Sequence, residues 1–307
     1  MLNISHFSKT YPGGKRAVED LSLAVPAGQI VGFIGHNGAG KTTTLRCAAG
    51  ILDFSEGTIE IDGHDIRREP VAAKQVTAFL PDNPDLYEFM TGVQYLTFIA
   101  DIYGIPAGER TRRVQEYAGA FELTAALGSA IGSYSHGMKQ KLALISALMR
   151  KPRLLILDEP INGLDPIGIA EVRDFIRALC EERGKTILIS SHILSEIALL
   201  ADDIGIIDHG VLLEEESLVE LEQKNGKVLR FTVSNATVAA QLLQKEMGVR
   251  DVAVENGREL TVRDLRLDTG AAVRRFVEAG LVVSDAHLYE DTLEDYFKRI
   301  TGGEGIA

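Results

Sequence analysis

The stretch GHNGAGKT, residues 35–42, decides the fold of this chain. Its glycines and its Lys-Thr pair fit the pattern G-x-x-x-x-G-K-[ST] of a phosphate-binding loop. The apolar run IVGFI (30–34) precedes it and the helix-like run TTLRCAAGIL (43–52) follows it, which is the strand–loop–helix context that the motif requires. The sequence therefore predicts an α/β fold in which this loop joins a buried strand to a helix; a mere tight turn is the alternative.

Each part of the loop suits the binding of a nucleoside triphosphate. Its backbone N–H groups turn inward around the β-phosphate, and the following helix adds the partial positive charge of its N-terminus. Lys41 is expected to reach the β- and γ-phosphate oxygens, and the Thr42 hydroxyl is expected to ligate Mg²⁺. The residues assigned to the nucleotide in this loop are Gly35, His36, Asn37, Gly38, Ala39, Gly40, Lys41, Thr42 and Thr43.

An acidic pair supplies the second half of the predicted site. The run LLILDEP (154–160) is an apolar strand that ends in Asp158, whose carboxylate is expected to join the Mg²⁺ shell. Because side chains alternate along an extended chain, Glu159 is expected to point toward a water behind the γ-phosphate and to orient that water or take its proton. An acidic pair at a strand end can also be a solvated turn.

The apolar runs divide into two kinds. Short period-two runs predict half-exposed antiparallel strands, whereas continuous β-branched runs predict strands of a parallel sheet covered on both faces. A helix-rich stretch with Pro and Gly breaks, residues 85–150, is predicted to be an inserted helical subdomain. The first kind comprises 2–8, 21–25 and 58–61, and the second comprises 30–34, 154–158, 186–190 and 204–208.

A composition change near LEEESLVELEQKNGK (213–227) predicts a linker helix and a domain boundary, so that residues 1–218 and 219–307 form separate domains. The second domain is predicted to have the order βαββαβ plus a final helix, which is ferredoxin-like. Its predicted strands are 227–234, 249–255, 258–264 and 281–289, and its helices are 236–247, 268–279 and 291–302.

Composition limits the partners and the compartment. A formal net charge of -12 argues against a nucleic-acid partner, which needs a basic face to neutralise phosphates. Cys47 and Cys180 are too few for a disulfide framework or a zinc cluster, so we expect reduced thiols in a cytosolic protein. The sequence contains no signal-peptide pattern and no apolar run of about 18 residues, so a membrane role requires a separate partner.

Five motifs in order carry a resemblance that covers residues 1 to about 215. In this order the chain resembles the nucleotide-binding subunit of an ATP-binding cassette (ABC) transporter, which implies an ATPase. The resemblance implies a head-to-tail dimer with two ATP molecules between the subunits, and attachment to a membrane permease at the cytoplasmic face. The motifs are GHNGAGKT (35–42), YSHGMKQKL (134–142), LLILDEP (154–160), INGLDP (161–166) and SSH (190–192).

The resemblance also implies roles for residues outside the phosphate loop. Ser135 and Gly137 would bind the γ-phosphate of the ATP held by the other subunit. Asp165 would belong to the loop that crosses the dimer, or cap a helix that starts with Pro166, and the two roles can coexist. His192 would hold the γ-phosphate and the attacking water, or cap a helix. Tyr11 would stack on adenine, or be a surface tyrosine in a hairpin.

Two departures from the family pattern leave alternatives open. His136 and Met138 interrupt the usual Ser-Gly-Gly-Gln signature, and Asp82 stands where a glutamine usually contacts Mg²⁺. An acidic residue there, and the terminal LYEDTLEDYFKRITG (288–302), resemble a branch of drug and antibiotic exporters. The segment after Asp82 would dock the permease, or belong to the core of the helical subdomain. One rival hypothesis is a lone P-loop kinase or GTPase, which predicts no intermolecular signature and, for a GTPase, an N-K-x-D motif that is absent here. The other is a non-hydrolysing ATP sensor.

Overall fold

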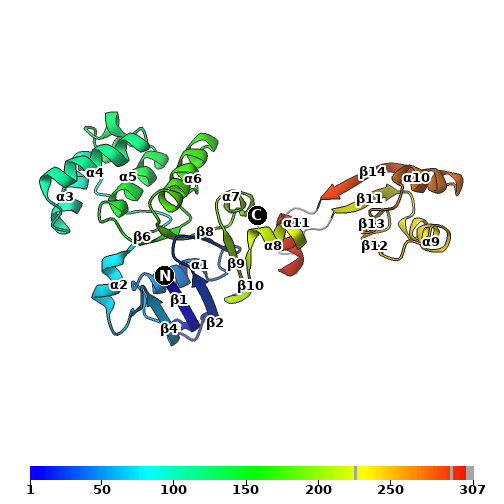
Figure 1. Cartoon of the computed structure of the whole chain (residues 1–307), viewed down its shortest axis with the longest axis horizontal. Coiled ribbons are helices and arrows are strands. Elements are labelled where there is room, and N and C mark those ends of the chain that lie inside the picture. The colour runs from blue at the N-terminus through cyan, green and yellow to red at the C-terminus, as the bar shows by residue number, and fades with distance from the viewer. Residues whose placement is uncertain (225–226, 291–292, 302–307) are drawn as a thin grey trace. The chain divides into compact units, whose positions relative to one another are not determined.

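The computed structural model describes residues 1–224, 227–290 and 293–301. These form two compact units, which divide after Leu218 (Figure 1). No helix in the described ranges is long and apolar enough to cross a membrane.

A six-stranded sheet forms the frame of the first unit. Its order is β10-β9-β3-β8-β7-β6, and the strands from β9 to β6 run parallel. All the residues of β3, β7 and β8 are buried, as the continuous apolar runs predicted for strands covered on both faces. The strands are β3 (Ile30–Ile34), β6 (Thr77–Leu80), β7 (Leu154–Asp158), β8 (Thr186–Ser191), β9 (Asp203–Asp208) and β10 (Val211–Ser217).

An antiparallel sheet of order β2-β1-β4-β5 packs with the parallel sheet around helix α1 (Lys41–Ala48). Leu45 and Cys47 of α1 are fully buried among side chains of both sheets, including Phe7 and Phe33. This core fixes the direction in which α1 leaves the phosphate loop. The strands are β1 (Leu2–Thr10), β2 (Arg16–Val25), β4 (Glu56–Ile61) and β5 (His64–Asp65), which include all three predicted period-two runs.

The predicted helical subdomain is present. Helices α3, α4 and α5 lie together on one side of the first unit in Figure 1. Thr91 is the N-cap of helix α3 and forms a reciprocal capping box with Gln94, and Ser135 is the N-cap of α5. The helices of the first unit are α1, α2 (Pro70–Val76), α3 (Gly92–Ile102), α4 (Ala107–Ala120), α5 (His136–Leu148), α6 (Pro166–Glu181) and α7 (Leu194–Ala198), with 3-10 turns η1 (Thr124–Ala126) and η2 (Ile131–Ser133).

The prediction of a linker across residues 213–227 was wrong in its first part. Val211–Ser217 is the edge strand β10, which pairs antiparallel with β9, and helix α8 (Leu218–Lys224) begins only after it. Three consecutive glutamates favour a solvated segment by composition. An edge strand accepts them because its outward side chains face solvent.

The second unit has the predicted βαββαβ order and the ferredoxin-like strand order β12-β13-β11-β14, all antiparallel. Phe231 and Phe276 are fully buried and meet edge-to-face at 5.4 Å in its core. Of the predicted last helix, residues 291–292 and 302 lie outside the described residues. The elements are β11 (Lys227–Val233), α9 (Ala236–Glu246), β12 (Val252–Val254), β13 (Glu259–Val262), α10 (Thr269–Glu278), β14 (Val283–Glu290) and α11 (Leu293–Ile300).

Candidate active site

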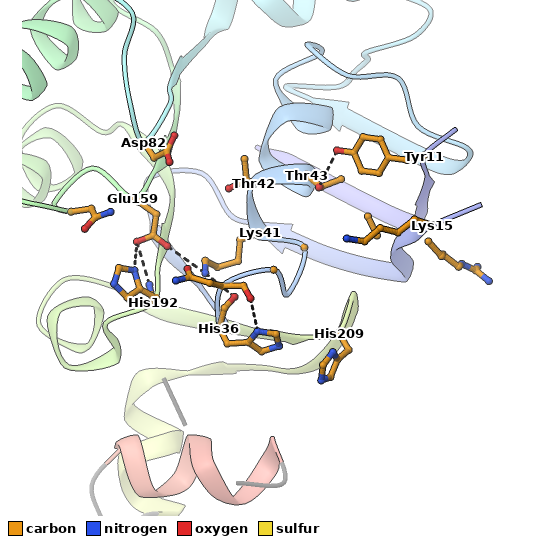
Figure 2. Close-up of a pocket in the computed structure, with 16 residues that line it drawn as sticks. Tyr11, Lys15, His36, Lys41, Thr42, Thr43, Asp82, Glu159, His192 and His209 are labelled. Carbon is orange, nitrogen blue, oxygen red and sulfur yellow. Dashed lines mark hydrogen bonds and ion pairs between the residues drawn. The ribbon is translucent and has the colours of Figure 1, made fainter. Parts of the chain in front are cut away.

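A cavity of about 740 Å³ opens over the phosphate loop. Figure 2 shows Asp82 and Glu159 on one side of it, Tyr11 on the other, and Lys41 and Thr42 between them. Most predicted nucleotide residues line it. The lining residues are Tyr11, Lys15, Arg16, Ala17, His36, Asn37, Gly38, Gly40, Lys41, Thr42, Thr43, Asp82, Glu159, Asn162, His192 and His209.

The phosphate loop depends on glycine at two positions. Gly40, the N-cap of α1, has φ +112°, and a Cβ there would lie 2.8 Å from the carbonyl oxygen of Ala17. A Cβ on Gly35 would lie 2.3 Å from the carbonyl oxygen of Ile207. Larger residues would therefore push the loop off the neighbouring backbone. The neighbouring backbone therefore restricts the loop to this shape.

Lys41 is held by the loop and by an acid across the cavity. Its Nζ donates to the carbonyl oxygens of Gly35 at 2.5 Å and His36 at 3.3 Å. The same Nζ lies 3.3 Å from Oε1 of Glu159, and both side chains are at least nine-tenths buried. A bound triphosphate would therefore compete with Glu159 for the ammonium group of Lys41.

Glu159 also binds His192. Its Oε2 lies 2.8 Å from His192 Nδ1 and accepts from the His192 backbone N–H at 3.3 Å. The predicted helix cap is not made, because α7 starts at Leu194 and its N-cap is Ile193. Glu159 faces the cavity as expected, but not by strand alternation, since its φ is +48° and the chain has left the extended conformation.

Asp158 is fully buried at the end of β7. Its Oδ1 accepts hydrogen bonds from Ser190 Oγ at 2.7 Å and Thr42 Oγ1 at 3.2 Å. Burial raises the pKa of Asp158; the two hydroxyl hydrogen bonds lower it, and the charges of Asp82 and Glu159 raise it further. Ser190 also accepts the backbone N–H of Glu159 at 3.0 Å, so one hydroxyl positions both acids.

The residues around Asp158 fit a hard divalent cation. Asp158 Oδ2 is buried and has no hydrogen-bond partner in the described part of the chain, which leaves one carboxylate oxygen for an additional ligand. The negative charges of Asp82 and Glu159 both disfavour the ionised form of Asp158, which a bound cation would offset, and oxygen donors are what Mg²⁺ prefers. Thr42 adds a hydroxyl to the same set.

Tyr11 and Asp82 lie at opposite margins of the cavity. The Tyr11 hydroxyl is 3.2 Å from Thr43 Oγ1, and its ring is open to the cavity. Asp82 is exposed; its Oδ1 accepts from the Asn83 N–H at 2.8 Å, and its carbonyl oxygen accepts from Gln140 of α5 at 2.7 Å. Asp82 therefore connects the cavity to the helical subdomain.

The predicted signature residues do not line this cavity. Ser135 caps α5 by accepting the Met138 N–H at 3.2 Å, and its side chain is exposed. Gly137 packs near Leu164. Asp165 caps α6 by accepting the Gly168 N–H at 3.0 Å, which confirms the local capping role. The structure thus separates these residues from the phosphate loop of the same chain.

Sequence reasoning missed five residues that line the cavity, Lys15, Arg16, Ala17, Asn162 and His209, and the serine that organises its acids, Ser190. Lys15 and Arg16 follow Tyr11 in a short hairpin and add positive charge beside the loop. Asn162 and His209 lie in turns whose position depends on the folded sheet. Ser190 lies within the SSH motif, which could have drawn attention to it; only the pairing of β7 with β8 gives it a role.

Comparisons with known proteins agree with this geometry. The family model described as ABC transporter matches residues 18–162. The bacitracin transport ATP-binding protein BcrA of Bacillus licheniformis is 39% identical over all of this chain and 99% of the relative. BcrA of Enterococcus faecalis is 36% identical over all of this chain and 98% of the relative. A solved ATP-binding subunit of an ABC transporter is 31% identical over 73% of this chain and 92% of its own, with a TM-score of 0.67. This chain therefore belongs to the ABC transporter family, as one of its ATP-binding, ATP-hydrolysing subunits.

Proposed function

We propose that this subunit powers a separate membrane permease that exports an antibiotic or drug-like compound. Relatives named for bacitracin transport and daunorubicin/doxorubicin resistance match almost the whole chain, the second unit included. The observation that carries the hydrolytic step is the contact of Glu159 with both Lys41 and His192. A protein that only senses ATP does not require a buried carboxylate beside Lys41 and His192, so that alternative is not favoured.

The side chains divide the work of hydrolysis. Lys41 and the loop N–H groups bind the phosphates, and Tyr11 offers its ring to the adenine. Glu159 accepts the proton of the attacking water, while His192 orients Glu159 and bonds to the γ-phosphate. Thr42, Asp158 and Asp82 would hold Mg²⁺, which would neutralise developing charge on the phosphate oxygens.

The exposed start of α5 supplies the second half of each site in a head-to-tail pair of subunits. Ser135 presents a hydroxyl and the first N–H groups of a 13-residue helix, an arrangement that favours an anion. It lies outside the cavity of its own chain, so its phosphate ligand belongs to a partner chain. Asp165, at the start of α6, is proposed to face the same junction.

ATP-driven dimerisation tests this pairing in a Glu159→Gln background that slows hydrolysis. Ser135→Asp is the informative change, because aspartate still caps the helix but places a negative charge against the γ-phosphate. We expect it to retain ATP binding and to lose the dimer in light scattering. Ser133→Ala is the control, since the side chain of Ser133 donates to the carbonyl oxygen of Ala130 in the adjacent turn and makes no other hydrogen bond among the described residues. A Ser135→Asp chain that dimerises as well as its parent would rule out the signature contact.

Phosphate release tests hydrolysis separately. The parent chain with ATP and Mg²⁺ should turn over, and Glu159→Gln should reduce the rate at least about 100-fold while ATP binding persists. Equal phosphate release by both chains would remove Glu159 from the chemistry.

A further inference from the structure

A second cluster of metal-ligating side chains lies at the edge of the nucleotide cavity. His36 comes from the phosphate loop, and Asp208 and His209 come from the end of β9 and the turn after it. One ligand atom from each of the three lies within 4.8 Å of the other two. Figure 2 shows His36 and His209 next to each other on the same side of the cavity, away from Asp82 and Glu159.

The hydrogen bonding of His36 leaves one ring nitrogen for a cation. His36 Nδ1 lies 2.8 Å from the carbonyl oxygen of Asn37, which can only accept, so Nδ1 carries the proton. In the neutral ring, Nε2 then presents a lone pair. A backbone carbonyl that fixes the tautomer of a histidine is the usual outer-shell partner of a metal ligand.

His36 Nε2 and Asp208 Oδ1 face each other without a hydrogen bond. They are 2.7 Å apart, and the two side chains are only 19% and 12% exposed. Both atoms are buried and make no hydrogen bond with any described residue, so the angle between them, and not their distance, prevents a hydrogen bond. A buried lone pair beside a buried carboxylate oxygen is unfavourable unless a positive charge lies between them.

His209 completes the cluster from the solvent side. Its Nε2 lies 3.8 Å from the same Asp208 oxygen, and its ring centroid lies 5.0 Å from that of His36. Its side chain is 69% exposed, so it can adjust. Ligand atoms around a tetrahedral Zn²⁺ lie roughly 3.3–3.6 Å apart, so the 2.7 Å contact must open and the 3.8 Å contact must close slightly.

We propose that His36, Asp208 and His209 form a site for a Zn²⁺-like divalent transition metal. Two imidazoles and one carboxylate suit Zn²⁺, whereas Mg²⁺ prefers oxygen ligands alone. Three protein ligands leave a fourth position that opens toward the cavity. A metal held here would tie the phosphate loop to the turn after β9. This site is separate from the Asp158 site, and it does not depend on the proposed export function.

The test is a Co²⁺ titration of the full chain, free of tags and pretreated with chelator, followed by displacement with Zn²⁺. The d–d absorption of Co²⁺ reports imidazole ligation and coordination number. We expect one saturable site, and we expect His209→Ala and Asp208→Asn each to weaken it by at least about tenfold. His6→Ala is the matched control, because His6 and Asp20 form an exposed pair at 2.8 Å without a third ligand in the described structure.

Because the His209 side chain is exposed, His209→Ala should fold normally, and an unchanged melting temperature relative to the parent would show this. A loss of metal binding in that variant then reports the missing ligand. Equal metal affinity in the parent, His209→Ala and His6→Ala would overturn the proposal and place the metal elsewhere. No saturable binding below about 1 mM would also overturn it, and would leave a proton as the cation between His36 and Asp208.

Discussion

Replacing Glu159 with glutamine should destabilise the nucleotide-free protein as well as stop turnover. Glu159 Oε1 lies 3.3 Å from Lys41 Nζ, with both side chains buried. At an effective dielectric near 20, opposite charges at this distance attract by about 5 kcal/mol. Because the glutamine oxygen still accepts a hydrogen bond, we expect a net loss of about 2–3 kcal/mol. The melting temperature should fall by roughly 4–12 °C.

The same substitution should strengthen ATP binding. In the parent chain the triphosphate must take Lys41 away from Glu159, and in Glu159→Gln that competition disappears. We expect the affinity for a slowly hydrolysed ATP analogue to rise roughly tenfold or more, as measured by calorimetry with Mg²⁺. The direction is opposite to the change in stability, which separates competition for Lys41 from general damage to the fold.

Glu171→Gln is the matched control for this prediction. Glu171 forms an ion pair with Lys141, but its side chain is 36% exposed, so its loss should cost less than about 1 kcal/mol. Melting scans of the three chains at one heating rate provide the comparison. An unchanged melting temperature in Glu159→Gln, together with unchanged nucleotide affinity, would show that the Lys41–Glu159 pair contributes nothing.

Three further predictions concern the acids and the chain division. Burial raises the folded-state pKa of Asp158, so its negative charge opposes folding at pH values above that pKa. Asp158→Asn should therefore melt at a higher temperature than the parent at neutral pH. The difference in melting temperature should disappear as the pH falls through the folded-state pKa of Asp158. Asp82→Asn should need more Mg²⁺ for ATP-driven dimerisation and should dimerise better without metal. The reason is that the Asp82 carboxylate and a γ-phosphate charge about 6 Å from it repel by about 3 kcal/mol at a dielectric near 20. An identical Mg²⁺ midpoint in the two chains would contradict this. A chain ending at Leu218 should bind ATP within about twofold of the parent in calorimetry, because the cavity residues all precede that point; a folded truncation that binds no ATP would contradict this.

The parts of the site that could be predicted are those encoded within a few residues. The glycines of the phosphate loop and the acids that end β7 carry their chemistry in local order, so the sequence predicted both and the strands beside them. The ferredoxin-like order of the second unit followed from alternating runs of different period.

Contacts between strands that are distant in sequence could not be predicted. Ser190 joins Asp158 and Glu159 only because β8 lies next to β7, and the chain gives no local sign of this pairing. The orientation of Glu159 was expected for the wrong reason, since its left-handed backbone turns the side chain. The glutamates of β10 look like a linker until β9 supplies a partner strand.

The strand order of the parallel sheet has a consequence for biosynthesis. Strands β3 and β7 do not pair with each other; β8 lies between them, although it follows both in the chain. At about 5–20 residues per second, the ribosome needs roughly 10–30 s to proceed from Ile30 to Thr186. During that time the apolar run 30–34 emerges from the exit tunnel without either of its neighbouring strands, because β9 follows β8 in the chain. Nascent chains arrested before residue 186 should therefore be held by chaperones, and release should follow the emergence of both β8 and β9.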